Sequence, residues 1–119
     1  MKKIVLIEDD IVIQKIYSHK LEIDGYKVIL ALSADQGFGL ISKEIPDLVL
    51  LDIMLPGKMN GFDLLEMLKK NAKLKKIPVI VITNLDNEKT QALKVGAMDY
   101  LIKSNTDITQ LSQMVKKYI

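Results

Sequence analysis

The sequence contains no cysteine and no arginine, and it has few aromatic residues. Without cysteine it has no disulfide framework and no thiolate metal site. All 17 basic residues are lysine, so the side chain that most often reads guanine edges is missing. Because the net charge is only +2 and aromatic residues make up 5%, we expect no direct contact with nucleic acid.

The sequence also lacks an apolar run long enough for a transmembrane helix or a signal peptide. The N-terminal apolar run covers only Ile4–Ile7 before Glu8 interrupts it. Apolar residues make up 49% and charged residues 27%, a balance typical of soluble globular proteins. We therefore expect one domain over residues 1–119, located in the cytoplasm and without membrane contact.

Short apolar strands alternate with helical patterns along the whole chain. The expected strands are Lys3–Ile7, Tyr26–Leu30, Leu48–Leu51, Ile77–Ile82 and Met98–Ile102. The expected helix starts, in order, are Asp9 or Asp10, Ser33 with Gln36 in a capping box, Asn60, Asp86 or Asn87, and Thr106. Buried strands separated by helices predict an α/β doubly wound fold with a five-stranded parallel sheet and helices on both faces.

The helical spacing predicts which side chains face inward. These positions are Val12 or Ile13, Ile16, Tyr17 and Leu21 in the first helix, and Ile108, Leu111, Val115 and Ile119 in the last. The second helix, expected to run to about Ser42, contains Gly37 and Gly39, each of which costs a helix roughly 1 kcal/mol. We therefore expect the second helix to be the least regular.

Chemically active side chains follow four of the five expected strands. Glu8 and Asp9 follow the first strand, Asp52 the third, Thr83 the fourth and Lys103 the fifth. The carboxyl ends of strands form the ligand crevice of an open parallel sheet. Three carboxylates, a hydroxyl and an ammonium group are therefore expected at one edge of the sheet.

This set of groups suits phosphoryl transfer with a metal ion. Clustered carboxylates without histidine or cysteine favour Mg²⁺, with Mn²⁺ as the second choice. Lys103 and Thr83 provide a cation and a hydroxyl donor for phosphoryl oxygens. A carboxylate can itself be the nucleophile, and Asp52 is the natural acceptor.

Four segments that carry these residues resemble the signature blocks of response-regulator receiver domains. The segments are Val5–Asp9, Leu50–Pro56, Val81–Thr83 and Gly96–Lys103. The resemblance runs from Lys3 to the C-terminus. It implies the flavodoxin-like strand order 2-1-3-4-5, with five helices, and a stand-alone single-domain receiver in two-component signalling.

The resemblance also implies a role for each site residue. A sensor histidine kinase or a phosphotransfer protein would pass a phosphoryl group from a phosphohistidine to Asp52. Asp9 and Asp52 would bind Mg²⁺ directly, Glu8 mainly through water, and Met54 through its backbone carbonyl. The chain would catalyse only its own phosphorylation and dephosphorylation, so we do not expect an enzyme with an output reaction.

The same resemblance implies a two-state switch. Lys103 would pair with the phosphoryl group, the Thr83 hydroxyl would move toward it, and Tyr100 would turn inward. The driving force is a new charge of about −1.5 to −2. Because the sequence ends directly after the last helix, we expect the output to be a surface. That surface combines the helix ending at Gly96, the strand Met98–Ile102 and the last helix, and it would bind a downstream protein.

Two residues and one loop depart from the receiver pattern. Ser104 stands where proline is usual, Asn84 stands where a small residue is usual, and the loop Gly57–Gly61 is one residue longer. We hypothesise that Asn84 and Leu85 narrow access to Asp52 and alter the lifetime of the phosphoryl group. His19, the only histidine, is expected on the first helix, away from the site.

Three alternatives belong to other classes of protein. A nucleotide or flavin site needs a glycine-rich or hydroxyl-rich loop after the first strand, whereas this chain has Glu8-Asp9-Asp10 there. A Toprim-type nuclease needs an Asp-x-Asp motif, whereas this chain has Asp52-Ile53-Met54. The remaining alternative is a receiver-like interaction module that is never phosphorylated.

Overall fold

The computed structural model describes residues 1–85 and 87–119, whose strands and helices alternate as the sequence predicts. The elements are β1 (Lys3–Ile7), α1 (Ile11–Ile23), β2 (Lys27–Ala31), α2 (Ala34–Glu44), β3 (Leu48–Leu51), α3 (Gly61–Lys70), β4 (Val79–Thr83), α4 (Lys89–Val95), β5 (Asp99–Ile102), the 3₁₀ turn η1 (Lys103–Asn105) and α5 (Ile108–Tyr118). Within these residues the strands form one parallel sheet in the order β2-β1-β3-β4-β5, which confirms the expected fold and strand order. No helix among these residues is long and apolar enough to span a membrane.

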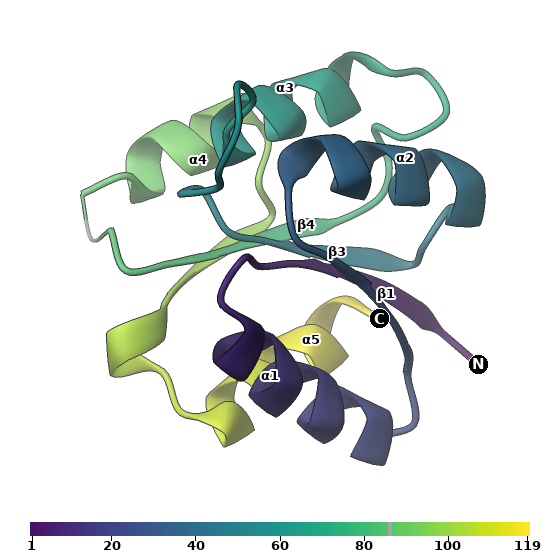
Figure 1. The fold of residues 1–119 in the computed structure, drawn as a ribbon, viewed down its shortest axis with the longest axis vertical. Helices are drawn as coiled ribbons and strands as arrows, with labels where there is room; N and C mark the ends of the chain where they lie inside the picture. The colour runs from purple at the N-terminus through teal and green to yellow at the C-terminus, as the bar shows by residue number, and fades with distance from the viewer. Residues whose placement is uncertain (86) are drawn as a thin grey trace.

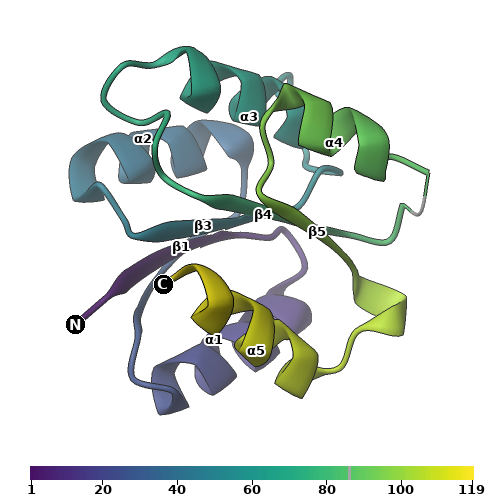
Figure 2. The same ribbon diagram turned by 180° about the vertical axis from the view of Figure 1, so that it is seen from behind.

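The helices form two layers, one on each face of the sheet. Figure 1 shows α2, α3 and α4 above the sheet and α1 and α5 below it, and Figure 2 shows the same layers from behind. Side chains of β1 alternate between the two layers: Val5 and Ile7 enter the upper core, whereas Ile4 and Leu6 enter the lower one. Because both faces are covered, the strand reads as a continuous apolar run. Burial of each large side chain contributes roughly 1.5–3 kcal/mol.

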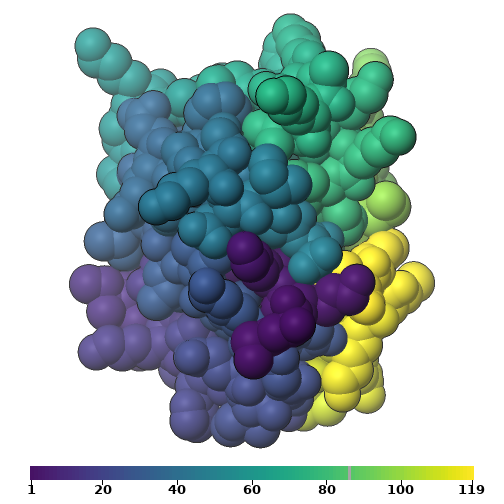
Figure 3. Space-filling model, turned by 90° about the vertical axis from the view of Figure 1, so that its right-hand side faces the viewer, coloured from purple at the N-terminus to yellow at the C-terminus, as the bar shows by residue number. Residues whose placement is uncertain are grey.

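The strand register brings the candidate residues to one edge of the sheet. Ile7 pairs with Leu51, so Glu8 and Asp52 lie just beyond the ends of neighbouring strands. The β4–β5 pairing ends at Thr83. Figure 3 shows the opposite edge, where the start of β1 (purple) lies beside the end of α5 (yellow). The parallel topology therefore separates the candidate site from both termini.

The helix α2 is regular, so the expectation that it would be the least regular helix is wrong. Ser33 caps it by accepting a hydrogen bond from the Gln36 N–H, while the Gln36 side chain accepts from the N–H of Leu32. A Cβ atom on Gly37 would lie 2.4 Å from Cδ1 of Ile7, so this glycine lets the helix approach the sheet closely. Among the described residues the shortest α-helix is α4, with 7 residues. Packing outweighs intrinsic propensity here.

The inward face of α1 also differs from the prediction. Leu21 is buried and Tyr17 packs against the lower core, as expected, and Ile13, the alternative to Val12, is half-buried. Ile16, however, is 53% exposed. The polar residues Gln14 and Ser18 are buried instead. Gln14 faces inward because its amide donates to backbone carbonyls at the ends of β1 and β2.

Two helix starts differ from the sequence prediction. For α4 the prediction was Asp86 or Asn87; Asp86 lies outside the described residues, and the observed N-cap is Glu88. The N-cap of α5 is Asp107, not Thr106, because Asp107 forms a reciprocal capping box with the third residue of the helix.

Candidate functional site

A shallow cleft of about 250 Å³ lies at the carboxyl ends of the strands. Its lining residues are Glu8, Asp9, Asp10, Ile13, Asp52, Met54, Thr83, Asn84 and Lys103. The cleft therefore brings together every side chain that the strand-end pattern identified, and it adds Asn84 from the loop after β4.

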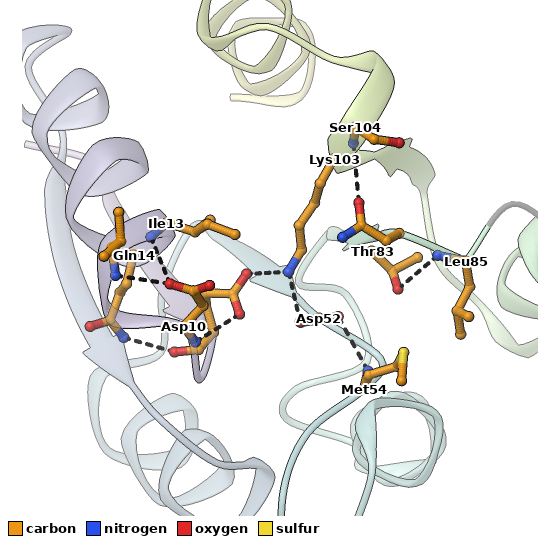
Figure 4. Close-up of polar contacts among 12 residues, drawn as sticks. Asp10, Ile13, Gln14, Asp52, Met54, Thr83, Leu85, Lys103 and Ser104 are labelled. Atoms are coloured by element: carbon orange, nitrogen blue, oxygen red, sulfur yellow. Dashed lines mark hydrogen bonds and ion pairs between the residues drawn. The ribbon is translucent and has the colours of Figure 1, made fainter.

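Lys103 lies between two buried carboxylates. Its Nζ atom is 2.8 Å from Oδ2 of Asp52, and it also donates to Oε1 of Glu8 (Figure 4). The side chains of Lys103, Glu8 and Asp52 are 10%, 0% and 5% exposed. Charge-assisted hydrogen bonds are strong when they are shielded from water. Lys103 is thus the counter-ion of both acids, although the sequence alone gave no sign of its contact with Glu8.

The electrostatics of this group are set by burial and by the ion pairs. Burial raises the pKa of Glu8, and the hydrogen bond from Lys103 opposes that rise. Burial alone would lower the pKa of Lys103, but its bonds to Asp52 and Glu8 outweigh this effect and the pKa is raised. Lys103 therefore stays protonated at neutral pH.

The Asp52 carboxylate has a defined orientation. Its Oδ1 accepts a hydrogen bond from the Met54 N–H at 3.2 Å, while Oδ2 faces Lys103. The backbone N–H of Asp52 donates to the carbonyl of Ile7 at 3.1 Å, which fixes the chain at the end of β3. The Met54 side chain is exposed, and a metal-binding role for the Met54 carbonyl stays a prediction.

Three carboxylates in the cleft fit a hard divalent cation. One oxygen each from Glu8, Asp9 and Asp52 lie within 4.8 Å of one another. Glu8 and Asp52 are buried, whereas Asp9 is exposed, so the cluster opens to solvent. Oxygen ligands with access to water suit Mg²⁺, which keeps several of its waters when it binds protein. The donor set therefore fits the predicted metal site.

Thr83 and Tyr100 both contact the backbone of Leu85. The buried Thr83 hydroxyl accepts a hydrogen bond from the Leu85 N–H at 3.3 Å. The Tyr100 hydroxyl donates to the Leu85 carbonyl, and Tyr100 is only 7% exposed. Tyr100 thus lies inward in this structure, and a movement of Tyr100 on phosphorylation stays a prediction.

Asn84 and Ser104 are bonded to each other. Oδ1 of Asn84 accepts a hydrogen bond from the Ser104 N–H at 3.1 Å. Asn84 lines the cleft, but Leu85 is not among the lining residues. Of the two residues expected to narrow access to Asp52, only Asn84 is therefore placed to do so.

Comparisons with known proteins show which family this chain resembles. The sequence model of the response regulator receiver domain family matches residues 4–116. The chain is 38% identical to the DNA-binding dual master transcriptional regulator RpaA of Synechocystis, over 87% of this chain and 43% of that protein. The BeF3-activated N-terminal receiver domain of Klebsiella pneumoniae RstA is 33% identical, with a TM-score of 0.89 and coverage of 98% and 97%. The chemotaxis protein CheY4 of Vibrio cholerae is 26% identical, with a TM-score of 0.90 and coverage of 100% and 99%. The chain spans 39% and 42% of the first curated relatives that it matches.

Proposed function

This chain belongs to the response regulator receiver domain family, and on that basis we propose that Asp52 is its phosphoacceptor. Accepting a phosphoryl group in two-component signalling is the function of this family. The donor is a phosphohistidine on a sensor histidine kinase or a phosphotransfer protein. The observation that carries the proposal is the position of Asp52, whose carboxylate lines an open cleft between the Met54 N–H and the Lys103 ammonium.

The proposed reaction moves one phosphoryl group between two side chains. A carboxylate oxygen of Asp52 attacks phosphorus, and the bond between phosphorus and the histidine nitrogen breaks. The nitrogen keeps the electron pair, and the product on Asp52 is an acyl phosphate. Lys103, which already bonds to Asp52, pairs with an oxygen of the arriving group. The Thr83 hydroxyl, in the same cleft, donates to another.

Asp9, Asp52 and Glu8 hold Mg²⁺ in this proposal, with Mn²⁺ as the alternative and the Met54 carbonyl as a further ligand. When bound, the ion would neutralise charge on the phosphoryl oxygens. Support comes from the grouping of the three carboxylates and from the exposure of Asp9. Lys103 offsets only part of their negative charge, so the cluster attracts a cation.

Phosphorylation is proposed to bias a switch built from Thr83 and Tyr100. The added charge draws the Thr83 hydroxyl, and both residues bond to Leu85 in the loop that leads to α4. A change there reaches the face formed by α4, β5 and α5. That face is the proposed docking surface for a downstream protein. We place the protein in the cytoplasm.

The deciding experiment is the intact mass of the protein after incubation with acetyl phosphate and Mg²⁺. The parent is expected to gain one phosphoryl group, an increment of ~80 Da, and Asp52→Asn is expected to gain none. The mass is read within minutes under acidic quench, so that hydrolysis does not hide the adduct. A parent that stays unmodified would indicate a receiver-like interaction module instead. If the Asp52→Asn variant also gained a phosphoryl group, the acceptor would be a residue other than Asp52.

A further inference from the structure

The bond between Asn84 and Ser104 joins two departures from the receiver pattern. The donor is the backbone N–H of Ser104 and the acceptor is Oδ1 of Asn84, 20 residues away (Figure 4). Proline, the usual residue at position 104, has no N–H and cannot form this bond. The contact therefore needs both departures: the asparagine at position 84 as acceptor and a residue with a backbone N–H at position 104.

This bond lies next to both side chains proposed to hold the phosphoryl group. Asn84 directly follows Thr83, and Ser104 directly follows Lys103. Backbone pairing between β4 and β5 ends with Thr83 opposite Ile102. The Asn84 side chain adds one more link just beyond the end of that pairing. It therefore holds the loop after Thr83 against the turn that begins at Lys103.

We propose that this bond, the Asn84–Ser104 clasp, prolongs the life of the phosphoryl group on Asp52 by restricting the approach of water. The inference rests on the function proposed above. In hydrolysis a water oxygen attacks phosphorus, the bond from phosphorus to the Asp52 oxygen breaks, and the carboxylate leaves with the electron pair. The water proton passes to solvent, and inorganic phosphate is released.

The position of Asn84 gives the clasp this effect. Its side chain is exposed and lines the cleft, so in the clasped state it occupies part of the route to Asp52. Closing an active site against water slows side reactions such as hydrolysis of a reactive intermediate. The clasp is one solvent-exposed hydrogen bond, so its loss changes the rate by about two- to fivefold.

The clasp is first tested in the unphosphorylated protein. Hydrogen exchange of the Ser104 amide, followed by NMR, is compared in the parent, Asn84→Ala and Ser104→Ala. Asn84→Ala removes the acceptor, so the Ser104 amide is expected to lose protection by about two- to fivefold. Ser104→Ala keeps the backbone N–H, and residue 104 is expected to stay protected. Equal protection in the parent and Asn84→Ala would show that no clasp forms in solution.

Phosphoryl lifetime is then measured by intact mass after acetyl phosphate is removed at constant Mg²⁺. Asn84→Ala and Ser104→Pro are each expected to shorten the lifetime, whereas the matched control Ser104→Ala keeps it. The double variant Asn84→Ala/Ser104→Pro is expected to match the single variants, because all three lack the same bond. An unchanged lifetime in Asn84→Ala, or an equal loss in Ser104→Ala, overturns the role of the clasp. A parent that takes up no phosphoryl group overturns the proposed function itself, and the amide exchange separates the two failures.

Discussion

Thr83 and Tyr100, on neighbouring strands, bind opposite ends of the same residue, Leu85. The Thr83 hydroxyl accepts from its N–H at 3.3 Å, and the Tyr100 hydroxyl donates to its carbonyl. A hydroxyl that accepts one hydrogen bond still has its own hydrogen to donate. Thr83 can therefore contact a phosphoryl oxygen while it stays bonded to the loop, which links the site mechanically to Tyr100.

Tyr100→Phe tests this link without adding bulk. The variant leaves the Leu85 carbonyl without its donor, so unfolding in urea is expected to require about 1 kcal/mol less free energy. Exchange of the Leu85 amide is expected to accelerate, because its loop is held from one side only. Thr83→Val, which removes the other partner, is expected to have the same effect on that amide. Unchanged exchange in both variants would argue against a link through Leu85.

Lys103→Met is expected to destabilise the protein in the absence of divalent cations. The buried side chains of Glu8 and Asp52 would both lose their counter-ion, a change that costs about 3 kcal/mol. Added Mg²⁺ is expected to restore more stability to this variant than to the parent. Urea unfolding with and without Mg²⁺ measures both effects.

Lys3→Met is the matched control for the loss of a lysine ion pair. Lys3 pairs with Glu44, but their side chains are 37% and 22% exposed. Surface pairs of this kind contribute about 0–1 kcal/mol, so only a small loss is expected, with no response to Mg²⁺. Similar behaviour of the two variants would contradict the special role of Lys103.

Asp9→Asn and Asp10→Asn make the same change of charge at adjacent positions and separate metal binding from fold. Asp9 belongs to the carboxylate cluster, whereas Asp10 caps α1 through the N–H groups of Val12 and Ile13. Asparagine also caps helices well, so Asp10→Asn is expected to keep the fold. Calorimetric titration with Mg²⁺ is expected to show a loss for Asp9→Asn of at least about tenfold, the cost of losing even an outer-shell partner. An equal loss of Mg²⁺ affinity in both variants would mean that affinity depends on the total negative charge and not on ligation by Asp9.

The sequence predicted those parts of the molecule that depend on local pattern. The apolar run Leu48–Leu51 is a strand with the predicted bounds, and Asp10 and Asn60 cap helices as expected. These features need only a few neighbouring residues, so they can be recognised from spacing. The strand order came from the family resemblance, because alternation alone leaves several topologies open.

Long-range contacts could not be predicted in the same way. Lys103 and Glu8 are 95 residues apart, and nothing in either neighbourhood encodes their bond. The burial of Gln14 in place of Ile16 has a similar cause, because backbone carbonyls from two strands need a donor there. Which side chains form such contacts depends on tertiary packing, and this packing overrides the helical pattern.

Ser112→Ala is expected to weaken the contact between α1 and α5 in a pH-dependent way. The Ser112 hydroxyl donates to Asp24, and this bond is the main reason that the Asp24 pKa lies below its ordinary 3.8, with further help from Lys20 and Lys116. A lowered carboxyl pKa stabilises the fold above the ordinary value, and the stabilisation is lost as pH falls through the folded-state pKa. The variant should lose about 1 kcal/mol at neutral pH.

The difference between the parent and Ser112→Ala should therefore shrink as pH falls below 3.8. Unfolding in urea across that range measures it. Ser18→Ala is the control, because the Ser18 hydroxyl donates to the backbone carbonyl of Lys15 within α1 and not to a carboxylate. The control should show a difference that does not change with pH. If the loss of stability in Ser112→Ala also stayed constant with pH, the lowered pKa of Asp24 would not be its cause.

Gly61 is the first residue of α3 and Gly39 lies within α2, but alanine should have opposite effects on stability at the two positions. A Cβ atom on Gly61 would lie 2.3 Å from the carbonyl oxygen of Asp52 and 2.5 Å from Cα of Ile53, whereas one on Gly39 would meet nothing within 4 Å. Gly39→Ala should stabilise α2 by roughly 0.5–1 kcal/mol, since alanine restricts the unfolded chain and favours helix.

Gly61→Ala should cost about 1–3 kcal/mol, because the backbone atoms of Asp52 and Ile53 cannot yield as a flexible side chain would. The clash also pushes on the peptide that carries Asp52, so Mg²⁺ affinity and phosphorylation should fall in Gly61→Ala and stay unchanged in Gly39→Ala. Urea unfolding, Mg²⁺ titration and intact mass measure these effects on the same samples. If Gly61→Ala kept full stability and affinity, the loop from Gly57 to Gly61 would not fix the position of Asp52.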